Sequence, residues 1–143
     1  MTRIWRIGAD KIIYIYMLYQ DKTDRIIKAF YKVYNHLGYG FLEKVYNNAF
    51  LIELSKAGFE VSSQFPIKVF YHDIQVGDYY ADIIVDNCIV IENKAMDSIR
   101  EEHEYQLINY LKATDIEIGL LFNFGKKPEF RRKIFTNSNK KSE

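Results

Sequence analysis

The sequence of 143 residues lacks several features that would assign it to a class at once. Cys88 is its single cysteine, which excludes an internal disulfide and fits a reducing compartment. Its net charge is +1, so charge alone does not indicate a nucleic-acid-binding protein. The apolar run at residues 12–19 is too short to span a bilayer, and no small-residue cleavage site follows it. We therefore expect a cytoplasmic protein outside the membrane, with a length typical of one domain that has a substantial core.

Aromatic side chains are what the sequence has in excess, with 12 Tyr and 10 Phe. Such residues more often fill a core or an interface than form a stacking platform for single-stranded nucleic acid. The same excess also suggests a third, weaker interpretation, a structural assembly protein.

The stretch at residues 79–94 predicts two apolar strands joined by a tight turn. Alternate residues of a strand point to the same face. A three-residue loop at residues 86–88 would place Asp82 opposite Glu92, with Cβ atoms roughly 4.5–5.5 Å apart. A two-residue loop would put the two carboxylates on opposite faces. Asn87 tolerates the positive φ that a three-residue loop commonly requires.

Two carboxylates at that separation repel each other, and burial makes it harder to keep both charged. Such a pair shares a proton or binds a cation, and its hard oxygen atoms suit Mg²⁺ or Mn²⁺ better than zinc. Lys94 lies on the same strand face as Glu92. The alternative is that Asp82 and Glu92 are solvated edge residues, with Lys94 as a salt-bridge partner.

Two helices are predicted before these strands. Asp21 is a plausible N-cap for the first, whose apolar stripe continues to a stop at Gly38. Residues 1–20 form an N-terminal extension, either an added strand or a segment outside the core. The second helix is predicted from about residue 40 to residue 57.

Glu43 lies on the apolar stripe of the second helix, three residues before Tyr46. A carboxylate in that position needs a partner or an ion if it is buried. The alternative is that Glu43 faces solvent in the first turn and complements the helix dipole.

The remaining elements are three strands, a helix and a further strand, followed by a last short strand. Pro66 argues that the first strand lies at an edge or contains a bulge. A capping box at residues 98–101 predicts the start of the third helix, on which Gln106 and Tyr110 are neighbours. The predicted ranges are 61–71, 75–85, 88–94, 116–124 and 130–135 for strands, with a disordered tail from residue 136. This order predicts an α/β sandwich with a mixed sheet.

Basic residues gather near the end of the chain. They are Lys126, Lys127, Arg131, Arg132 and Lys133. Contact with phosphates and a solvated basic edge explain such a group equally well.

The motifs follow one another as Asp82, then Glu92-Asn93-Lys94, then Gln106 and Tyr110. This order resembles the PD-(D/E)XK nuclease superfamily, in its RecB-like branch. The stretch at residues 40–46 (Gly-Phe-Leu-Glu-Lys-Val-Tyr) is similar to the signature of the bacterial GxxExxY protein family. Other family-like stretches lie at residues 76–79 and 123–125.

The resemblance covers residues 22–135 and implies a restriction-endonuclease-like three-layer sandwich, in which helices flank a central mixed β-sheet. Residues 21–135 would form this domain. The implied activity is metal-dependent cleavage of nucleic acid, DNA or RNA, with Mg²⁺ or Mn²⁺ as cofactor. A small protein of this kind leaves little surface for substrate selection, so a homo-oligomer or a helper protein would complete the site.

The resemblance also implies a set of metal ligands. Glu43, Asp82 and Glu92 would hold the ion, and the backbone carbonyl of Asn93 would be a further ligand. Lys94 would orient or activate the attacking water and offset negative charge in the transition state.

Further residues would support this site. Gln106 would help to hold the site or the substrate, with Tyr110 behind it, and His103 would line the same cleft. Tyr46 completes the signature that contains Glu43. Asn93 departs from the family pattern, which usually has an apolar residue there. The alternative function is a catalytically silent nuclease-like fold that binds nucleic acid or a protein.

Overall fold

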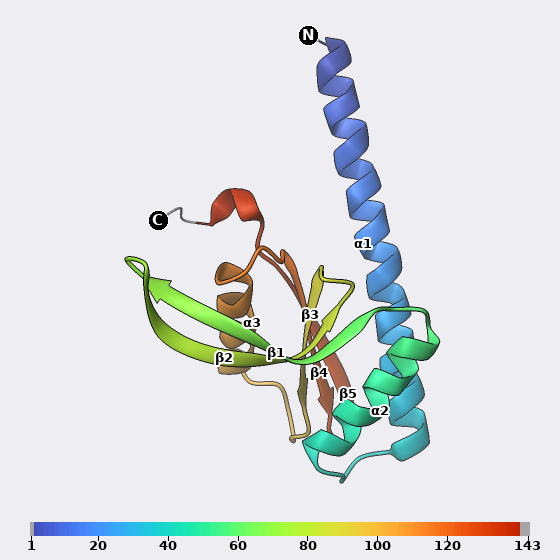
Figure 1. Cartoon of the computed structure of the whole chain (residues 1–143). Helices are drawn as coiled ribbons and strands as arrows, with labels where there is room; N and C mark the ends of the chain where they lie inside the picture. Colours follow the sequence, from blue (N-terminus) through green and yellow to red (C-terminus); the bar gives the residue numbers. More distant parts are fainter. Residues whose placement is uncertain (1, 141–143) are drawn as a thin grey trace.

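The computed structural model describes residues 2–140, which fold around one five-stranded sheet (Figure 1). The elements are α1 (Thr2–Leu37), α2 (Glu43–Lys56), β1 (Val61–Tyr71), β2 (Ile74–Val85), β3 (Ile89–Lys94), α3 (Glu101–Lys112), β4 (Ile118–Phe124), β5 (Pro128–Ile134) and a 3-10 helix (Asn137–Asn139). The predicted order of helices and strands is therefore confirmed.

The strands lie side by side in the order of the chain, from β1 at one edge to β5 at the other. Neighbouring strands are antiparallel except β3 and β4, which are parallel because α3 forms the crossover between them. This is the predicted mixed sheet. Pro66 lies in the edge strand β1, as the sequence indicated.

Helices cover both faces of the sheet, with α1 and α2 on one face and α3 on the other (Figure 1). The first core joins Phe30 of α1 and Phe50 of α2 to Phe122 of β4, with ring centroids 4.6 and 5.2 Å from that of Phe122. The second core packs Leu107 and Leu111 of α3 against the sheet. The predicted three-layer sandwich is therefore confirmed, and Phe30, Phe50 and Phe122 lie fully buried in its first core.

The first helix is longer than the sequence suggested, because α1 begins at Thr2 and passes through residue 21 without a break. The prediction of an N-cap at Asp21 is wrong: its carboxylate instead faces Arg25 one turn later at 3.6 Å. Neither proline nor a capping turn separates residues 2–20 from the amphipathic stretch that follows, so the helix propagates. The alternative of an added strand is also wrong. Within residues 2–140, no helix is long and apolar enough to cross a membrane.

Two further local predictions are corrected by hydrogen bonds. The third helix begins at Glu101 with Arg100 as its N-cap, and the Nδ1 atom of His103 accepts the backbone N–H of Arg100 at 3.3 Å, in place of a capping box at residues 98–101. Where a disordered tail was expected from residue 136, the backbone N–H of Asn137 donates to Glu117 at 2.8 Å and a 3-10 helix forms. Both contacts depend on side chains whose orientation the sequence pattern does not show. The last three residues of that tail, 141–143, lie outside the described residues.

Candidate metal centre

The turn between β2 and β3 sets the register of the carboxylates. Val85 lies opposite Ile89, which leaves residues 86–88 as a three-residue loop. The same register continues through the pair of residues 83 and 91, so the next positions along are Asp82 and Glu92. Asn87 has a φ of 55°, in the left-handed region. The predicted loop length, and with it the facing of the two carboxylates, is confirmed.

Backbone N–H groups hold both carboxylates in place. The N–H of Asn93 donates to Oδ2 of Asp82 at 2.8 Å, and the N–H of Asp82 donates to Oε1 of Glu92 at 3.2 Å. Glu92 is only 5% exposed and Asp82 is half-buried, in strands that have neighbours on both sides. They are therefore not solvated edge residues, and that alternative is excluded.

This enclosure disfavours two negative charges. Burial, and then the neighbouring Asp82, raise the pKa of Glu92 to about 8. Burial also raises the pKa of Asp82, although the Asn93 N–H and the Lys94 charge oppose the rise. The pair consequently favours a shared proton or a bound cation over two free charges.

Glu43 reaches the same region from the first turn of α2. It lines an open hollow of about 580 Å³ together with Asp82, Gln64 and Asn47. Partial burial raises the pKa of Glu43, Lys94 lowers it, and Asp82 raises it further. Glu43 is exposed, as expected of a first-turn residue, and it also faces the carboxylate pair.

The turn before α2 explains the motif at residues 40–46. Gly40 adopts a φ of 109°, which favours glycine. The hydroxyl of Tyr46 donates to the carbonyl of Gly38 at 2.6 Å and accepts the N–H of Phe41 at 3.2 Å. The buried Tyr46 ring stacks on Phe124 with centroids 4.6 Å apart. Tyr46 therefore holds the loop that leads into Glu43 and does not itself line the hollow.

Lys94 ends β3 two residues after Glu92, and His103 lies in the first turn of α3. The charge of Lys94 lowers the pKa of Asp82, Glu92 and Glu43. Burial, and then Lys94, also lower the pKa of His103.

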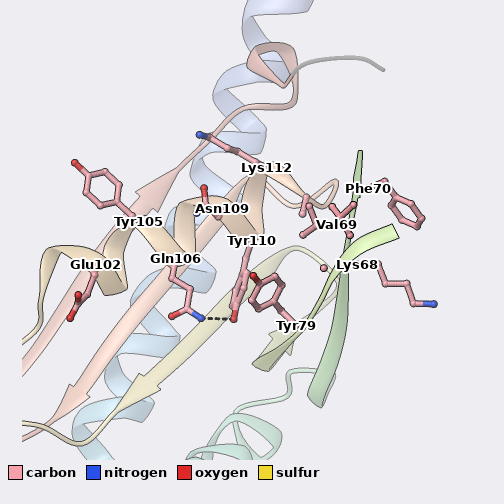
Figure 2. Close-up of a pocket in the computed structure, with 13 residues that line it drawn as sticks. Lys68, Val69, Phe70, Tyr79, Glu102, Tyr105, Gln106, Asn109, Tyr110 and Lys112 are labelled. Atoms are coloured by element: carbon pink, nitrogen blue, oxygen red, sulfur yellow. Dashed lines mark hydrogen bonds between the residues drawn. The ribbon is translucent and has the colours of Figure 1, made fainter. Parts of the chain in front are cut away.

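Gln106 and Tyr110 lie next to each other on α3 (Figure 2). Nε2 of Gln106 donates to the Tyr110 hydroxyl at 2.8 Å. Burial, and then the charge of Glu92, raise the pKa of Tyr110. Tyr110 packs in the same core as Val90, which lies on the face of β3 that carries Glu92.

Two polar residues at the hollow were not anticipated from the sequence. Asn47 accepts a hydrogen bond from Nδ2 of Asn93 at 2.9 Å, and this bond joins α2 to β3. Because Asn47 lies one helical turn after Glu43, the sequence could have indicated that it lies beside Glu43. Gln64 lies opposite Asp82 in the β1–β2 register but has a φ of 53° and is left out of the pairing, while its side chain hydrogen-bonds to Asp82. Nothing in the local sequence indicates this interruption of the strand pairing.

The basic residues near the C-terminus do not form one patch. Lys126 and Lys127 lie in the β4–β5 turn, and alternate residues of β5 point to opposite faces. Arg132 donates to Gln20 of α1 at 2.8 Å, whereas Arg131 faces Glu129 at 3.5 Å. Lys133 pairs with Glu104 of α3 at 2.7 Å. All of them are on or beside β5, at the sheet edge opposite β1.

The donor set fits a hard divalent cation. Its side chains present carboxylate oxygens and no thiolate, and the enclosed pair already favours added positive charge. In the described part of the chain, however, no three His, Cys, Asp or Glu side chains converge as a metal-binding group. Asp82 and Glu92 are in contact, and Glu43 lines the hollow beside them.

Comparisons with known proteins were informative at the level of the family. The family model described as PD-(D/E)XK nuclease superfamily matches residues 20–133. One similar solved structure is described as the crystal structure of SSO0001, with 20% sequence identity and a TM-score of 0.48. That match covers 65% of this chain and 50% of the other chain, so it spans half the length of that protein. The comparison with curated proteins found no match.

Proposed function

Because the chain belongs to the PD-(D/E)XK nuclease superfamily, we propose that it is a metal-dependent nuclease that hydrolyses phosphodiester bonds of DNA or RNA. The observation that carries the proposal is the pair of Asp82 and Glu92, enclosed side by side in the sheet. Without a cation, burial and mutual repulsion both destabilise the ionised pair. A divalent cation would turn the same arrangement into a binding site.

Within this proposal Glu43, Asp82 and Glu92 hold Mg²⁺ or Mn²⁺, with the backbone carbonyl of Asn93 as a further oxygen. When bound, such an ion makes water more acidic and supplies positive charge for the transition state. The backbone N–H groups that bond to Asp82 and Glu92 keep their oxygens oriented in advance.

Lys94 assists the attacking water and offsets negative charge that develops on the phosphate. Support for this role comes from its charge, which already acts on all three carboxylates. Gln106 and Tyr110 brace the α3 side of the site, and His103 lines the cleft beside Lys94. Placement in the RecB-like branch and in the GxxExxY family is part of the same proposal, as is a homo-oligomer or helper protein that completes the site. The cytoplasm remains the expected location.

A second function is supported by the position of Glu43. Since Glu43 is not gathered with Asp82 and Glu92 into one group of three among the described residues, the chain is also suited to bind nucleic acid or a protein without cutting. The nuclease is favoured because a binding module has no need for two enclosed carboxylates.

Calorimetric titration of Mn²⁺ and Mg²⁺ tests the proposal first, with wild type, Asp82→Ala and Asp78→Ala compared. Asp78 is a matched control, because it is an exposed aspartate on β2 four residues before Asp82. The same preparations are then incubated with single- and double-stranded DNA and RNA, with each metal and with chelator.

We expect wild type and Asp78→Ala to bind the ion and cleave at least one substrate, and Asp82→Ala to lose both properties. The loss in metal affinity should exceed the roughly 10–100-fold typical of removing a group that only supports a ligand. Metal binding without cleavage of any substrate would favour the binding module. A folded wild type that binds no divalent ion would overturn the nuclease.

A further inference from the structure

A second, larger hollow lies beside the carboxylate site, between the β1–β2 hairpin and α3 (Figure 2). Its volume is about 890 Å³. The distal half of the β1–β2 hairpin extends past α3 (Figure 1). Residues of the hairpin line one wall of the hollow, and residues of α3 line the other. We call this hollow the hairpin groove. Its aromatic and basic lining residues are Lys68, Phe70, Tyr79, Tyr105, Tyr110 and Lys112.

The inner end of the hairpin groove reaches the carboxylate pair. Tyr110 lines the groove and belongs to the same core as Val90, which lies two residues before Glu92 on the same face of β3. Tyr79 is the next aromatic residue outward, with its ring centroid 5.9 Å from that of Tyr110. A chain lying in the groove would therefore lead directly to the proposed site of cleavage.

Aromatic faces in the groove are open to a ligand. Tyr79 is 47% exposed, Tyr105 is 57% exposed and Phe70 is 47% exposed. Tyr79 points into the groove toward Tyr110, whereas Phe70 and Tyr105 lie at its outer rims (Figure 2), so a planar group that enters the groove meets the exposed ring of Tyr79. Unpaired bases present such planar groups, whereas the bases of a duplex are already stacked on one another.

Positive charge lies at the rims of the groove, on Lys68 of the hairpin and Lys112 of α3, whose side chains point away from its interior (Figure 2). The ammonium group of Lys112 lies 5.5 Å from the centroid of the Phe135 ring. Glu102, an acidic residue of the lining, faces Arg100 at 3.7 Å, which partly offsets its charge. Cations beside exposed aromatic faces match a phosphate backbone with unstacked bases.

We propose that the hairpin groove binds a single-stranded segment of nucleic acid and leads it to the carboxylate pair. This inference rests on the proposed nuclease function for its direction toward Asp82 and Glu92. It goes beyond that function by assigning a separate binding surface and the strandedness of the substrate. It also gives the exposed aromatic residues of the hairpin a role outside the core.

Binding of labelled ten-nucleotide DNA and RNA single strands to the full chain, in the presence of chelator, tests the groove without any cleavage. Fluorescence anisotropy is measured for wild type and variants, with a duplex of the same sequence for comparison. Tyr79→Ala is paired with Tyr80→Ala, because Tyr80 is the adjacent residue of β2 and is 53% exposed but does not line the groove. Lys112→Ala is paired with Lys56→Ala, because both lysines lie in the last turn of a helix.

We expect Tyr79→Ala to weaken single-strand binding about 5- to 100-fold, the range typical of losing one base–aromatic stack. Tyr80→Ala should stay within about twofold of wild type. Lys112→Ala should reduce the dependence of log K on log salt by about 0.7, the value for one phosphate contact on a single strand. Lys56→Ala should leave that slope unchanged, and wild type should bind the single strand more tightly than the duplex.

Different experimental outcomes would overturn the proposed binding groove and the proposed nuclease activity. Single-strand binding that depends on Tyr79, without cleavage on adding metal, would leave the groove and overturn the nuclease. Cleavage with equal binding by Tyr79→Ala and wild type would leave the nuclease and overturn the groove. If thermal melting shows that Tyr79→Ala is unfolded, Tyr105→Ala replaces it, because Tyr105 is exposed on α3. Tighter binding of the duplex, or binding of no oligonucleotide at all, would overturn the groove as a single-strand site.

Discussion

Asn93 is the middle residue of the Glu92-Asn93-Lys94 motif at the end of β3, where an apolar residue is usual in the family that the chain resembles. It is fully buried, and its Nδ2 atom donates to Asn47 of α2, while its Oδ1 atom is buried without a partner among the described residues. An unpaired buried acceptor costs free energy, so this asparagine is a poor choice for stability alone. Its hydrogen bond instead fixes the helix that carries Glu43 against the strand that carries Glu92 and Lys94.

We therefore expect the pair of Asn47 and Asn93 to position Glu43 at the expense of stability. Asn93→Val alone should lower the free energy of unfolding by about 1–2 kcal/mol relative to the double variant Asn47→Leu/Asn93→Val, because it leaves the carbonyl of Asn47 unpaired. The double variant should regain stability but bind Mn²⁺ about tenfold more weakly, the lower end of what a supporting contact contributes.

Urea unfolding of both single variants and the double variant gives the coupling free energy, and calorimetry gives the metal affinity. The free energy of unfolding reports the packing of the two asparagines, and the Mn²⁺ affinity reports whether they position Glu43. Strictly additive effects on unfolding, together with an unchanged Mn²⁺ affinity in the double variant, would show that the two asparagines do not position Glu43.

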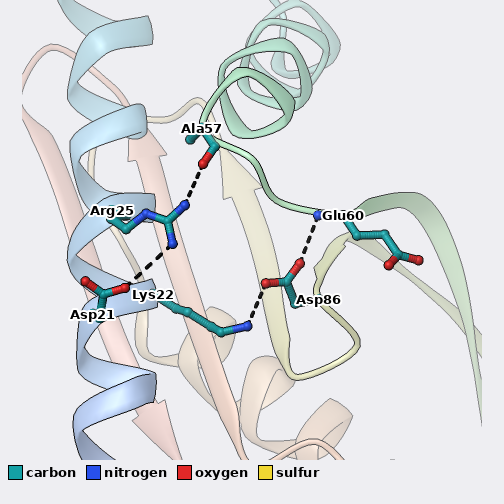
Figure 3. A network of polar contacts seen from close by, with 6 residues as sticks. All are labelled: Asp21, Lys22, Arg25, Ala57, Glu60 and Asp86. Carbon is teal, nitrogen blue, oxygen red and sulfur yellow. Dashed lines mark hydrogen bonds and ion pairs between the residues drawn. The ribbon is translucent and has the colours of Figure 1, made fainter.

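At the scale of elements, the β2–β3 turn is held to two other segments by one carboxylate (Figure 3). Asp86 accepts a hydrogen bond from Lys22 of α1 at 2.6 Å and from the backbone N–H of Glu60, just before β1, at 2.8 Å. This turn sets the register that brings Asp82 opposite Glu92. Asp86 therefore links the orientation of α1 to the geometry of the proposed site, although it lies outside it.

The charge of Asp86 makes this link dependent on pH. Burial would raise the pKa of Asp86, but Lys22 and the Glu60 N–H together lower it below its ordinary value. A carboxyl group whose folded-state pKa is lowered contributes stability above its unfolded pKa of about 4, and the contribution is lost as the pH falls through the folded value. Asp86→Asn should thus reduce the free energy of unfolding by about 1–2 kcal/mol at pH 7, and by progressively less below pH 4.

Denaturant unfolding of wild type and Asp86→Asn at several values between pH 7 and pH 2 measures this difference. Asn tolerates the left-handed φ of 50° at this position, so the turn itself is kept. Asp97→Asn is the control, because Asp97 is exposed in the loop before α3. A stability difference between wild type and Asp86→Asn that is the same at pH 7 and pH 2 would contradict the assignment to the ionised carboxylate.

At the scale of the whole molecule, the features that could be predicted from the sequence are those that depend on residues close together in the chain. The loop at residues 86–88, the facing of Asp82 and Glu92, and the mixed sheet all follow from period-two alternation and turn chemistry. The bond from Asn93 to Asn47 joins residues 46 positions apart, and no local pattern indicates which side chains meet across such a distance.

The length of α1 was missed for a related reason. Asp21 is a good capping residue, and a cap before an apolar stripe is the usual sign of a helix start. The helix continues through residues 2–20 because nothing there breaks it. Local helix propensity alone favours such a continuation only weakly. The side chains described in the first half of α1 do not enter the core: Ile12, Ile13, Tyr16 and Met17 are between 56 and 69% exposed.

Contact with the domain begins near residue 19. Tyr19 packs against the main core, and Gln20 accepts a hydrogen bond from Arg132 of β5.

We therefore expect a chain that begins at residue 18 to keep its melting temperature within about 3 °C, since roughly 1 kcal/mol shifts it by that amount in a domain of this size. It should also keep its Mn²⁺ affinity, because none of the side chains described before residue 18 lines the hollow beside Asp82. A second truncation that begins at Asp24 serves as the control: it removes Tyr19, Gln20 and Lys22, and should melt far lower. Circular dichroism and calorimetry distinguish the two chains. A large loss of stability or of metal affinity on removing residues 1–17 alone would mean that this part of α1 belongs to the folded domain and does not simply extend it.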